Sequence, residues 1–330
     1  MSGRPVADCS PAPEGAPDLQ EARGQELAKR TLELAAAGGH SLLLAGPPGS
    51  GKTLLALCLQ GLLPPLDPVE AEEAAAVRKA AREEEDALEW VRPFRCPPHT
   101  IRTAGMAGSV RPLRPGEVSR AHGGVLLLDD LPGYRREALA ALVRPLDEGR
   151  AVLQRQDGPV ELPARFQLVA TLNPCPCGFL GDPIGGCGCP PFRVRRHLGR
   201  VPRALLDRVD LRAWVGFIPW KEVRGPAGET TAQVRSRVAD ARAVQRERFG
   251  DPAALNALVS QEALARCCPL DRAGKALQET AFEKLRLTVR ALHAALRIAR
   301  TIADLAGSDT VRAAHLAEAL QHRGATWWAS

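Results

Sequence analysis

Two short runs of consecutive apolar residues, 42–45 and 125–128, stand out in the first half of the chain. Runs of this length are typical of strands that are buried on both faces of a parallel sheet. Residues 166–171 are expected to form another strand, and the alternating pattern of residues 209–217 predicts a further one. The pattern therefore predicts a domain of the α/β class, built on a parallel sheet.

Helical patterns lie between these strands and after them. Residues 26–37 are expected to form a helix that stops at Gly38-Gly39. Further helices are expected from residue 54, over the acidic stretch 70–90 and over 135–148. From residue 230 onward the expected helices span 230–249, 261–266, 270–285, 288–305 and 310–323. The C-terminal part therefore reads as a small all-α domain.

Proline and glycine mark the segments that interrupt this pattern. Residues 92–100 hold too many prolines for regular structure, and residues 219–229 read as a linker. Residues 102–118 are expected to form an inserted loop or hairpin. Residues 151–163 surround Asp157-Gly158, a turn signal that predicts a second hairpin.

The chain has 330 residues, which is enough for two domains. Residues 1–17 are rich in proline, glycine and alanine and are expected to be a disordered tail. The α/β domain is then expected over residues 18–220, and the all-α domain over residues 221–330.

The first expected strand leads into a phosphate-binding loop. The loop reads G-x-x-x-x-G-K-T and comprises Gly46, Pro47, Pro48, Gly49, Ser50, Gly51, Lys52 and Thr53. Its place between a buried strand and a helix makes the pattern specific. In such a loop, backbone N–H groups surround a polyphosphate, the lysine contacts the β- and γ-phosphates, and the threonine hydroxyl binds Mg²⁺. We therefore expect ATP and Mg²⁺ to bind here.

Polar side chains follow the next two strands. Asp129 and Asp130 come directly after the run 125–128, at the carboxyl end where ligands bind in open α/β sheets. Asp129 is placed to hold Mg²⁺ through water, and Asp130 is placed to polarise an attacking water. Asn173 follows the next strand, where it can contact the γ-phosphate or that water. Judged by residue type alone, Asn173 is better interpreted as a turn residue before Pro174 than as a catalytic residue.

Four cysteines come next in two close pairs, Cys175 with Cys177 and Cys187 with Cys189. Four thiolates can form a tetrahedral Zn²⁺ site, and such a site is structural because it leaves no position open for a substrate. The alternative is a loop with four reduced thiols, since the C-x-C spacing is tighter than the usual C-x-x-C. Zinc is the interpretation we favour.

The net charge of +6 fits a polyanionic partner without requiring one. A basic cluster follows the cysteines and comprises Arg193, Arg195, Arg196, His197, Arg200 and Arg203. It either contacts nucleic-acid phosphates or is simply solvated. No apolar run approaches the ~18–20 residues of a membrane span, and the N-terminus has no apolar signal core. We therefore expect a cytoplasmic protein.

In this order, the motifs resemble those of AAA+ ATPases of the magnesium-chelatase-like group. More narrowly, they resemble the YifB/ComM competence ATPases, which include a DNA branch-migration helicase. The resemblance covers about residues 18–323. It rests on Gly24-Gln25 through Gly39-His40, the phosphate loop, R-P-F-R at 92–95, P-G-E-V-S-x-A-H-x-G-V-L-x-L-D at 115–129, P-A-R-F-Q-L-V-A-x-x-N-P-C-P-C-G at 163–178, L-L-D-R-V-D at 205–210 and R-x-A-R-T-I-A-D-L-A-G at 297–307.

This resemblance implies an αβα P-loop domain, an α-helical lid and a homo-hexameric ring with ATP between subunits. It implies that Asn173 is the first sensor, that Arg208 is an arginine finger for the neighbouring subunit's ATP, and that Arg290 is the second sensor. Either arginine, taken alone, would be interpreted as part of a surface ion pair. The hairpins at 102–118 and 151–163 would line the pore. Their arginines Arg102, Arg111, Arg114 and Arg155 would then contact a DNA backbone.

Two departures from the family pattern matter. The family usually has Asp-Glu where this chain has Asp129-Asp130, so hydrolysis is expected to be slow unless the backbone compensates. Competence ATPases also usually carry an N-terminal Lon-protease-like domain, which this chain is expected to lack. The first functional hypothesis is an ATP-driven DNA motor, which the cysteine cluster favours. The alternatives are a chelatase-type motor that remodels a protein partner and an ATP-binding module with little hydrolysis.

Overall fold

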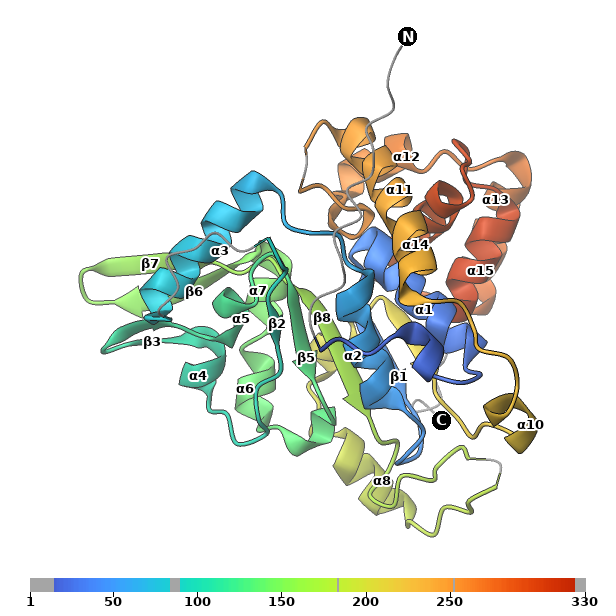
Figure 1. Cartoon of the computed structure of the whole chain (residues 1–330), viewed down its shortest axis with the longest axis horizontal. Helices are drawn as coiled ribbons and strands as arrows, with labels where there is room; N and C mark the ends of the chain where they lie inside the picture. Colours follow the sequence, from blue (N-terminus) through green and yellow to red (C-terminus); the bar gives the residue numbers. More distant parts are fainter. Residues whose placement is uncertain (1–14, 84–89, 183, 252, 324–330) are drawn as a thin grey trace.

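A parallel sheet with the strand order β2-β5-β8-β1-β9 forms the centre of the molecule (Figure 1). The computed structural model describes residues 15–83, 90–182, 184–251 and 253–323, so most of the expected N-terminal tail lies outside the described residues. In sheet order, the strands are Phe94–Arg95, Val125–Leu128, Gln167–Leu172, Leu42–Ala45 and Leu211–Trp214. The α/β class expected from the apolar runs is confirmed.

The central strands divide their side chains between two hydrophobic clusters. In β1, Leu42 and Leu44 belong to one cluster and Leu43 and Ala45 to the other, and β5 and β8 alternate in the same way. Because successive side chains of a strand point to opposite faces, each cluster covers one face of the sheet. Every residue of β1, β5 and β8 is buried, which explains why β1 and β5 read as unbroken apolar runs.

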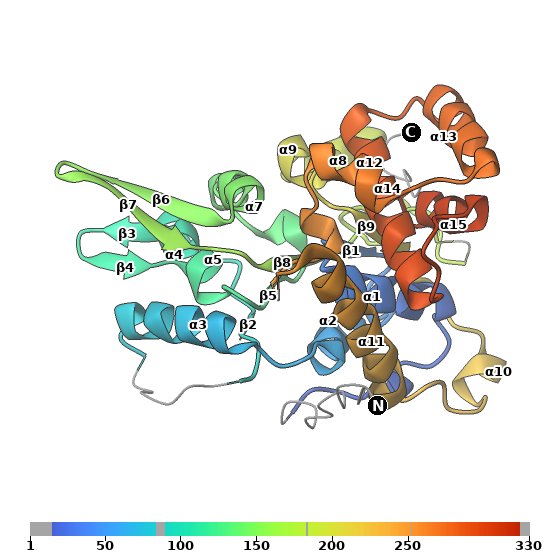
Figure 2. The same ribbon diagram turned by 90° about the horizontal axis from the view of Figure 1, so that it is seen from above.

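The first cluster joins the sheet to helices from both ends of the chain. It includes side chains of α1 (Glu26–Gly38), α2 (Lys52–Leu62), α11 (Thr231–Phe249) and α14 (Val289–Leu305). Figure 2 shows α11 lying along α1 and α2. One hydrophobic cluster therefore includes residues on both sides of the expected domain boundary between residues 220 and 221. That boundary stays a prediction.

The other face carries shorter helices and two hairpins. The helices are α4 (Thr103–Ala107), α5 (Glu117–Arg120), α6 (Arg136–Ala140), α7 (Val143–Glu148) and α9 (Arg203–Leu206). The hairpins are β3 (Gly108–Val110) with β4 (Leu113–Pro115), and β6 (Arg150–Arg155) with β7 (Gly158–Pro163). Both hairpins project from the body beside α3 (Pro68–Ala81), as Figures 1 and 2 show. Their tips touch, because Arg111 donates a hydrogen bond of 3.0 Å to Gln156.

Several expected elements differ in the structure. The helix expected over 135–148 is two helices, α6 and α7, because Pro145 has no N–H to donate to the Ala141 carbonyl and its ring disfavours a continuous helix there. The segment 92–100 contains β2, a two-residue edge strand too short to show a period. The expected linker contains α10 (Trp220–Val223). The acidic helix α3 ends at Ala81, and residues 84–89 lie outside the described residues.

The helices expected after residue 230 are confirmed. Besides α11 and α14 they are α12 (Gln261–Cys267), α13 (Arg272–Lys284) and α15 (Ala313–Arg323), with a short 3-10 helix at Asn256–Leu258. Four of them begin where a Thr, Ser or Asp side chain accepts a backbone N–H of the first turn; these residues are Thr230, Ser260, Asp271 and Thr288. No helix in the described ranges is long and apolar enough to cross a bilayer.

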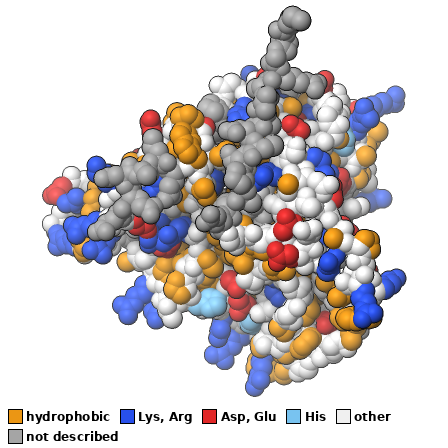
Figure 3. Space-filling model, viewed as in Figure 1, with side chains coloured by type: hydrophobic (Ala, Val, Ile, Leu, Met, Phe, Trp, Pro, Cys, Tyr) orange, Lys and Arg blue, Asp and Glu red, His pale blue; other side chains and the backbone are white. Residues whose placement is uncertain are grey.

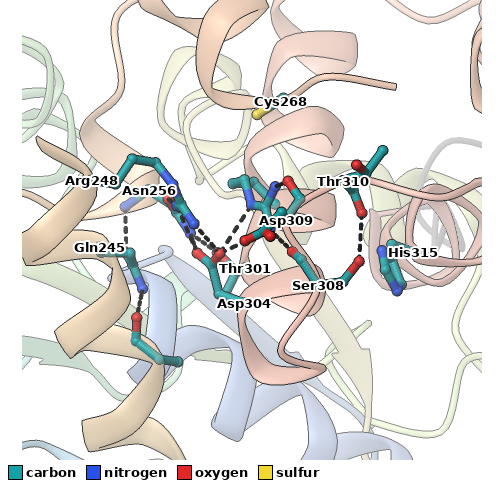
Figure 4. Close-up of polar contacts among 12 residues, drawn as sticks. Gln245, Arg248, Asn256, Cys268, Thr301, Asp304, Ser308, Asp309, Thr310 and His315 are labelled. Atoms are coloured by element: carbon teal, nitrogen blue, oxygen red, sulfur yellow. Dashed lines mark hydrogen bonds and ion pairs between the residues drawn. The ribbon is translucent and has the colours of Figure 1, made fainter. Parts of the chain in front are cut away.

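A buried carboxylate organises this helical region (Figure 4). The Asp304 side chain is fully buried. It accepts hydrogen bonds from Arg248 at 3.0 Å, from Arg300 at 3.0 Å and from Asn256 at 2.8 Å. Thr301, one turn earlier, contacts His40 at 2.8 Å, just before β1. The motif at 297–307 therefore ties the C-terminal helices to the sheet.

Candidate nucleotide-binding site

The phosphate loop connects the carboxyl end of β1 to the start of α2. Gly49 and Gly51 have φ values of +75° and +92°, which residues with a Cβ rarely adopt. A Cβ placed on either glycine would meet nothing within 4 Å, so the loop faces open space there. Gly46 is required for another reason, since its Cβ would lie 2.0 Å from the Val215 carbonyl oxygen. The loop is thus shaped by its glycines and open to a ligand.

Lys52 lies inside this loop. Its ammonium donates hydrogen bonds to the carbonyls of Gly46 at 2.9 Å and Pro47 at 2.7 Å. Burial lowers the pKa of Lys52, and the nearby carboxylates of Asp130 and Asp129 oppose this effect. The lysine is therefore held beside the acidic pair that the sequence predicts to share the site.

Asp129 stands between two threonine hydroxyls. Thr53 donates to one oxygen of Asp129 at 3.0 Å, and Thr171 donates to the same oxygen at 2.6 Å. A Mg²⁺ ion on the Thr53 hydroxyl would lie within one water molecule of the Asp129 carboxylate, because Mg²⁺ binds oxygen at about 2.1 Å. Hydroxyl and carboxylate oxygens are the ligands that Mg²⁺ prefers. The donor set therefore fits the ion predicted from the sequence.

Asp130 and Asn173 are also in contact. The Asn173 amide donates to the Asp130 carboxylate at 3.1 Å, and the Thr171 hydroxyl accepts the Asp130 backbone N–H at 2.7 Å. Asp130 has a positive φ of 50°, which turns the chain sharply after β5. The Asn173 Oδ1 and Ser50 Oγ atoms are buried without a protein partner. Buried polar atoms of this kind normally have partners, so these two are free for a ligand.

Three side chains outside the predicted set of site residues support this site. His99 contacts the Asp129 carbonyl at 2.6 Å, and His197 contacts the Asn173 carbonyl at 2.9 Å. Gln25 donates to the Gly216 carbonyl at 2.7 Å, next to the strand end that meets the phosphate loop. Gln25 lay in a family motif and His197 lay in the basic cluster, but neither pattern indicated these contacts, and His99 carried no signal.

Arg208 and Arg290 lie close to each other, away from the phosphate loop. Arg208 donates to the Asp147 carboxylate at 2.9 Å, and Arg290 donates to the same carboxylate at 3.0 Å. Burial acts to raise the pKa of Asp147, but the hydrogen bonds and charges of Arg208 and Arg290 outweigh it and lower the pKa. The Arg208 side chain is 15% exposed and that of Arg290 is 51% exposed, so both reach the surface.

The two arginines are remote from the phosphate loop of their own chain. The Arg208 carbonyl accepts a hydrogen bond of 2.6 Å from Ser41, which precedes β1, whereas the phosphate loop follows β1. Four residues of strand span about 13 Å, so the two sites occupy opposite ends of the sheet. Arg208 therefore faces away from the nucleotide site of its own subunit.

The four cysteines form a compact cluster. Their sulfur atoms all lie within 4.8 Å of one another, and the separations among Cys175, Cys177 and Cys187 are 3.3, 3.6 and 3.7 Å. Tetrahedral Zn²⁺ with Zn–S bonds of about 2.3 Å requires sulfurs about 3.8 Å apart. A backbone hydrogen bond from Phe179 and a contact with Cys175 lower the pKa of Cys177 to about 6. The cluster has the ligands and the spacing of a structural zinc site.

A cavity of about 610 Å³ lies away from all of these residues except Asp147. Its lining includes Gly124 and Gln167, which stand at the amino ends of β5 and β8. The phosphate loop lies at the carboxyl ends of the strands, so this cavity is not the nucleotide site.

A phosphate loop after the parallel strand β1, an acidic pair after β5, an asparagine after the intervening strand β8 and a helical C-terminal region together define a P-loop domain of the AAA+ class. A family model described as "Magnesium chelatase, subunit ChlI" matches residues 18–223, and one described as "Magnesium chelatase, subunit ChlI C-terminal" matches residues 228–323. The chain therefore belongs to the magnesium chelatase subunit ChlI family.

Two relatives and one solved structure extend this comparison. Competence protein ComM of Haemophilus influenzae is 42% identical over 93% of this chain and 60% of its own length. YifB of Escherichia coli is 40% identical over 93% of this chain and 60% of its own length. The chain thus spans 60% of the length of these curated relatives. A full-length MCM homolog from Methanopyrus kandleri has a similar fold, with a TM-score of 0.52 at 18% identity over 91% of this chain and 54% of that chain. The resemblance to YifB and ComM expected from the motifs is confirmed.

Proposed function

We propose that the protein is an ATPase that binds ATP with Mg²⁺ at the phosphate loop. The observation that carries this proposal is the connected set Thr53, Asp129, Thr171, Asp130 and Asn173, which lies beside Lys52 at the carboxyl ends of three neighbouring strands. This set supports the proposal because it could supply metal-binding, water-orienting and phosphate-sensing groups to one triphosphate.

Each group has a distinct task in this proposal. The backbone of residues 46–51 and the Lys52 ammonium hold the β- and γ-phosphates. Thr53 and Asp129 would hold Mg²⁺, which would supply positive charge beside the phosphates. Asp130 orients the attacking water and accepts its proton, and Asn173 keeps the Asp130 carboxylate in place through its amide N–H, while its Oδ1 has no partner within the chain.

We further propose that the protein acts as a ring of identical subunits, six in number by analogy with the family. The opposite placement of Arg208 and the phosphate loop supports this, since the arginine can serve only another copy's ATP. Arg290 donates to the same carboxylate as Arg208, that of Asp147. Both arginines would therefore enter the nucleotide site of the neighbouring subunit together. An arginine finger contributes about 10³–10⁵ in rate.

We propose that the protein moves along DNA. We also propose that it works in the cytoplasm. Arg102, Arg111, Arg114 and Arg155 are all exposed on or beside the two hairpins. On the face shown in Figure 3, Lys and Arg side chains gather over the end that carries these hairpins. The name of the relative ComM, a competence protein, points to the same class of partner. We also propose that the four cysteines hold one structural Zn²⁺ ion.

The ATPase proposal is tested by the rate of phosphate release from ATP and Mg²⁺, with particle mass measured in parallel. We expect turnover by assemblies larger than a monomer, no nucleotide binding by Lys52→Ala, and binding without turnover by Arg208→Ala. Normal turnover by Arg208→Ala in the assembled form would refute the role of that arginine.

The DNA proposal is tested by adding forked DNA to the same assay. We expect stimulation of wild type that weakens as salt rises, because phosphate contacts release counterions. Arg111→Ala/Arg114→Ala should lose the stimulation and keep basal turnover. The matched control is Arg266→Ala/Arg272→Ala, which removes two exposed arginines of the C-terminal helices. Equal stimulation of both double variants would show that the β3–β4 hairpin is not the DNA contact.

A further inference from the structure

The cysteine cluster is joined directly to the nucleotide site through the backbone. Cys175 follows Asn173 by two residues, at the end of β8, and is fully buried. After the second cysteine pair the chain enters α8 (Pro191–Leu198), whose His197 returns to the Asn173 carbonyl at 2.9 Å. The chain therefore leaves Asn173, passes through all four cysteines and comes back to the same residue. Figure 1 shows α8 beyond the ends of the central strands.

The same segment packs on the phosphate loop. Gly178 has a φ of +85°, and a Cβ placed on it would lie 2.4 Å from Cδ of Pro48. Cβ atoms do not approach other atoms so closely, so Gly178 allows the cysteine segment to contact the loop. Its N–H also donates to the Cys175 carbonyl at 2.9 Å, which closes a turn between the first two cysteines and the contact with Pro48.

We infer that one Zn²⁺ ion, bound by Cys175, Cys177, Cys187 and Cys189, holds the nucleotide site in its working geometry. Four thiolates fixed by one metal keep Gly178 against Pro48 and keep Asn173 facing Asp130. Without the metal, no coordinate bonds join the four sulfur atoms, and the segment between the two pairs loses its anchor. The zinc is thus a positioning element for the phosphate loop and for the first sensor. This inference rests on the proposed nucleotide site and extends it.

The metal-free state is best produced by Cys187→Ser/Cys189→Ser, because this pair lies away from β8 and both residues are only half-buried. The matched control is Cys267→Ser, a half-buried cysteine of α12 outside the cluster. Full-length proteins purified without chelators are compared for zinc content by elemental analysis, for affinity toward a fluorescent ATP analogue, for ATP turnover and for thermal unfolding. We expect one zinc per chain in wild type and control, and none in the double variant.

The double variant should bind the analogue several-fold more weakly and turn over ATP about tenfold more slowly, because small displacements of catalytic groups are costly. Adding Asn173→Ala should lower its turnover much less than the same change lowers wild-type turnover. This non-additivity is the signature of zinc acting through Asn173, which a merely structural zinc would not produce.

Three results would overturn the inference. They are a wild-type chain that takes up no zinc, a zinc-free variant with control-like affinity and turnover, and effects of the two changes that simply add. A failure of the ATPase proposal can be distinguished from these three results, because zinc content and affinity for the ATP analogue are measured without ATP turnover. If wild type hydrolyses no ATP but the double variant loses both zinc and affinity, the zinc inference holds for the phosphate loop and fails for Asn173.

Discussion

Arg208 and Arg290 are 82 residues apart in the sequence, yet both donate hydrogen bonds to the same carboxylate oxygen of Asp147, at 2.9 and 3.0 Å. Asp147 closes α7, Arg208 precedes β9 and Arg290 opens α14, so the carboxylate joins three parts of the chain. Two guanidinium groups would otherwise repel each other at this distance. Asp147 therefore holds both arginines in one orientation, toward the surface where a neighbouring subunit would bind.

We predict that Asp147→Asn lowers ATP turnover by roughly tenfold to a hundredfold while nucleotide affinity changes little, because misplaced catalytic groups lose rate rather than binding. Steady-state kinetics and analogue binding separate the two effects. Glu148→Gln is the control, since the neighbouring Glu148 pairs instead with Arg144. Unchanged or faster turnover of Asp147→Asn would show that the carboxylate restrains the arginines instead of positioning them.

Asp130→Glu should raise turnover. The Asp130 carboxylate is held by Asn173 at 3.1 Å, and one more methylene would carry it closer to an attacking water. Moving a catalytic carboxylate by about 1 Å toward its correct position can raise the rate by up to about 10²-fold. The KM for ATP should stay the same, and Asp130→Asn should reduce turnover below that of wild type. Slower turnover of Asp130→Glu would mean that the backbone at Asp130 already places the shorter side chain correctly.

Asp304→Asn should destabilise the fold by about 3 kcal/mol, because removing one partner of a buried ion pair leaves the other charge without compensation. The charges left behind are those of Arg300, whose side chain is buried, and of Arg248, which is partly exposed. Urea unfolding measures the loss. The control is Asp309→Asn, five residues further on at an exposed position. A loss below about 0.5 kcal/mol, the usual size of a surface effect, would refute the organising role of Asp304.

Acid should weaken the contact between α15 and α1 through Glu318. His322, whose Nε2 lies 3.7 Å from the carboxylate, and Arg30, which donates a hydrogen bond to it at 2.8 Å, lower the pKa of Glu318 to about 2 against the opposing effect of burial. The pKa in the unfolded chain is about 4.3, so the folded state favours the ionised form. The stabilisation is complete above pH ~5 and is lost progressively as the pH falls from there toward 2.

The measurement is the unfolding free energy of wild type and Glu318→Gln between pH 6 and pH 3. Wild type should lose more stability on acidification than the variant, and the two should converge at low pH. Glu279→Gln, which changes an exposed residue of α13, should follow wild type. Parallel curves for wild type and Glu318→Gln would contradict the assignment.

The sequence predicted the parts of the fold that depend on local pattern. Residues 42–45 and 125–128 carry unbroken apolar runs because both faces of those strands are buried, and the phosphate loop carries its glycines because the turn requires them. The edge strand Phe94–Arg95 escaped notice because two residues show no period and prolines surround them. The break between α6 and α7 was readable from Pro145 in hindsight.

The site was predictable only in part. Asp129 and Asn173 stand at strand ends that the pattern located, and Lys52 and Thr53 open the helix after the phosphate loop, so their meeting follows from the topology. Asp147 carries no such signal, because its partners are 61 and 143 residues away and an aspartate near a helix end is common. The close approach of Gly178 to Pro48 also depends on packing alone.

Placing the phosphate loop and Arg208 at opposite ends of one sheet has a consequence for how the protein behaves in a test tube. If Arg208 acts as proposed, an isolated copy holds only two incomplete half-sites, so specific activity should fall on dilution as neighbours separate. Lys52→Ala and Arg208→Ala should each be inactive when pure and should regain activity when mixed, because a junction between the two variants can pair an intact loop with an intact arginine.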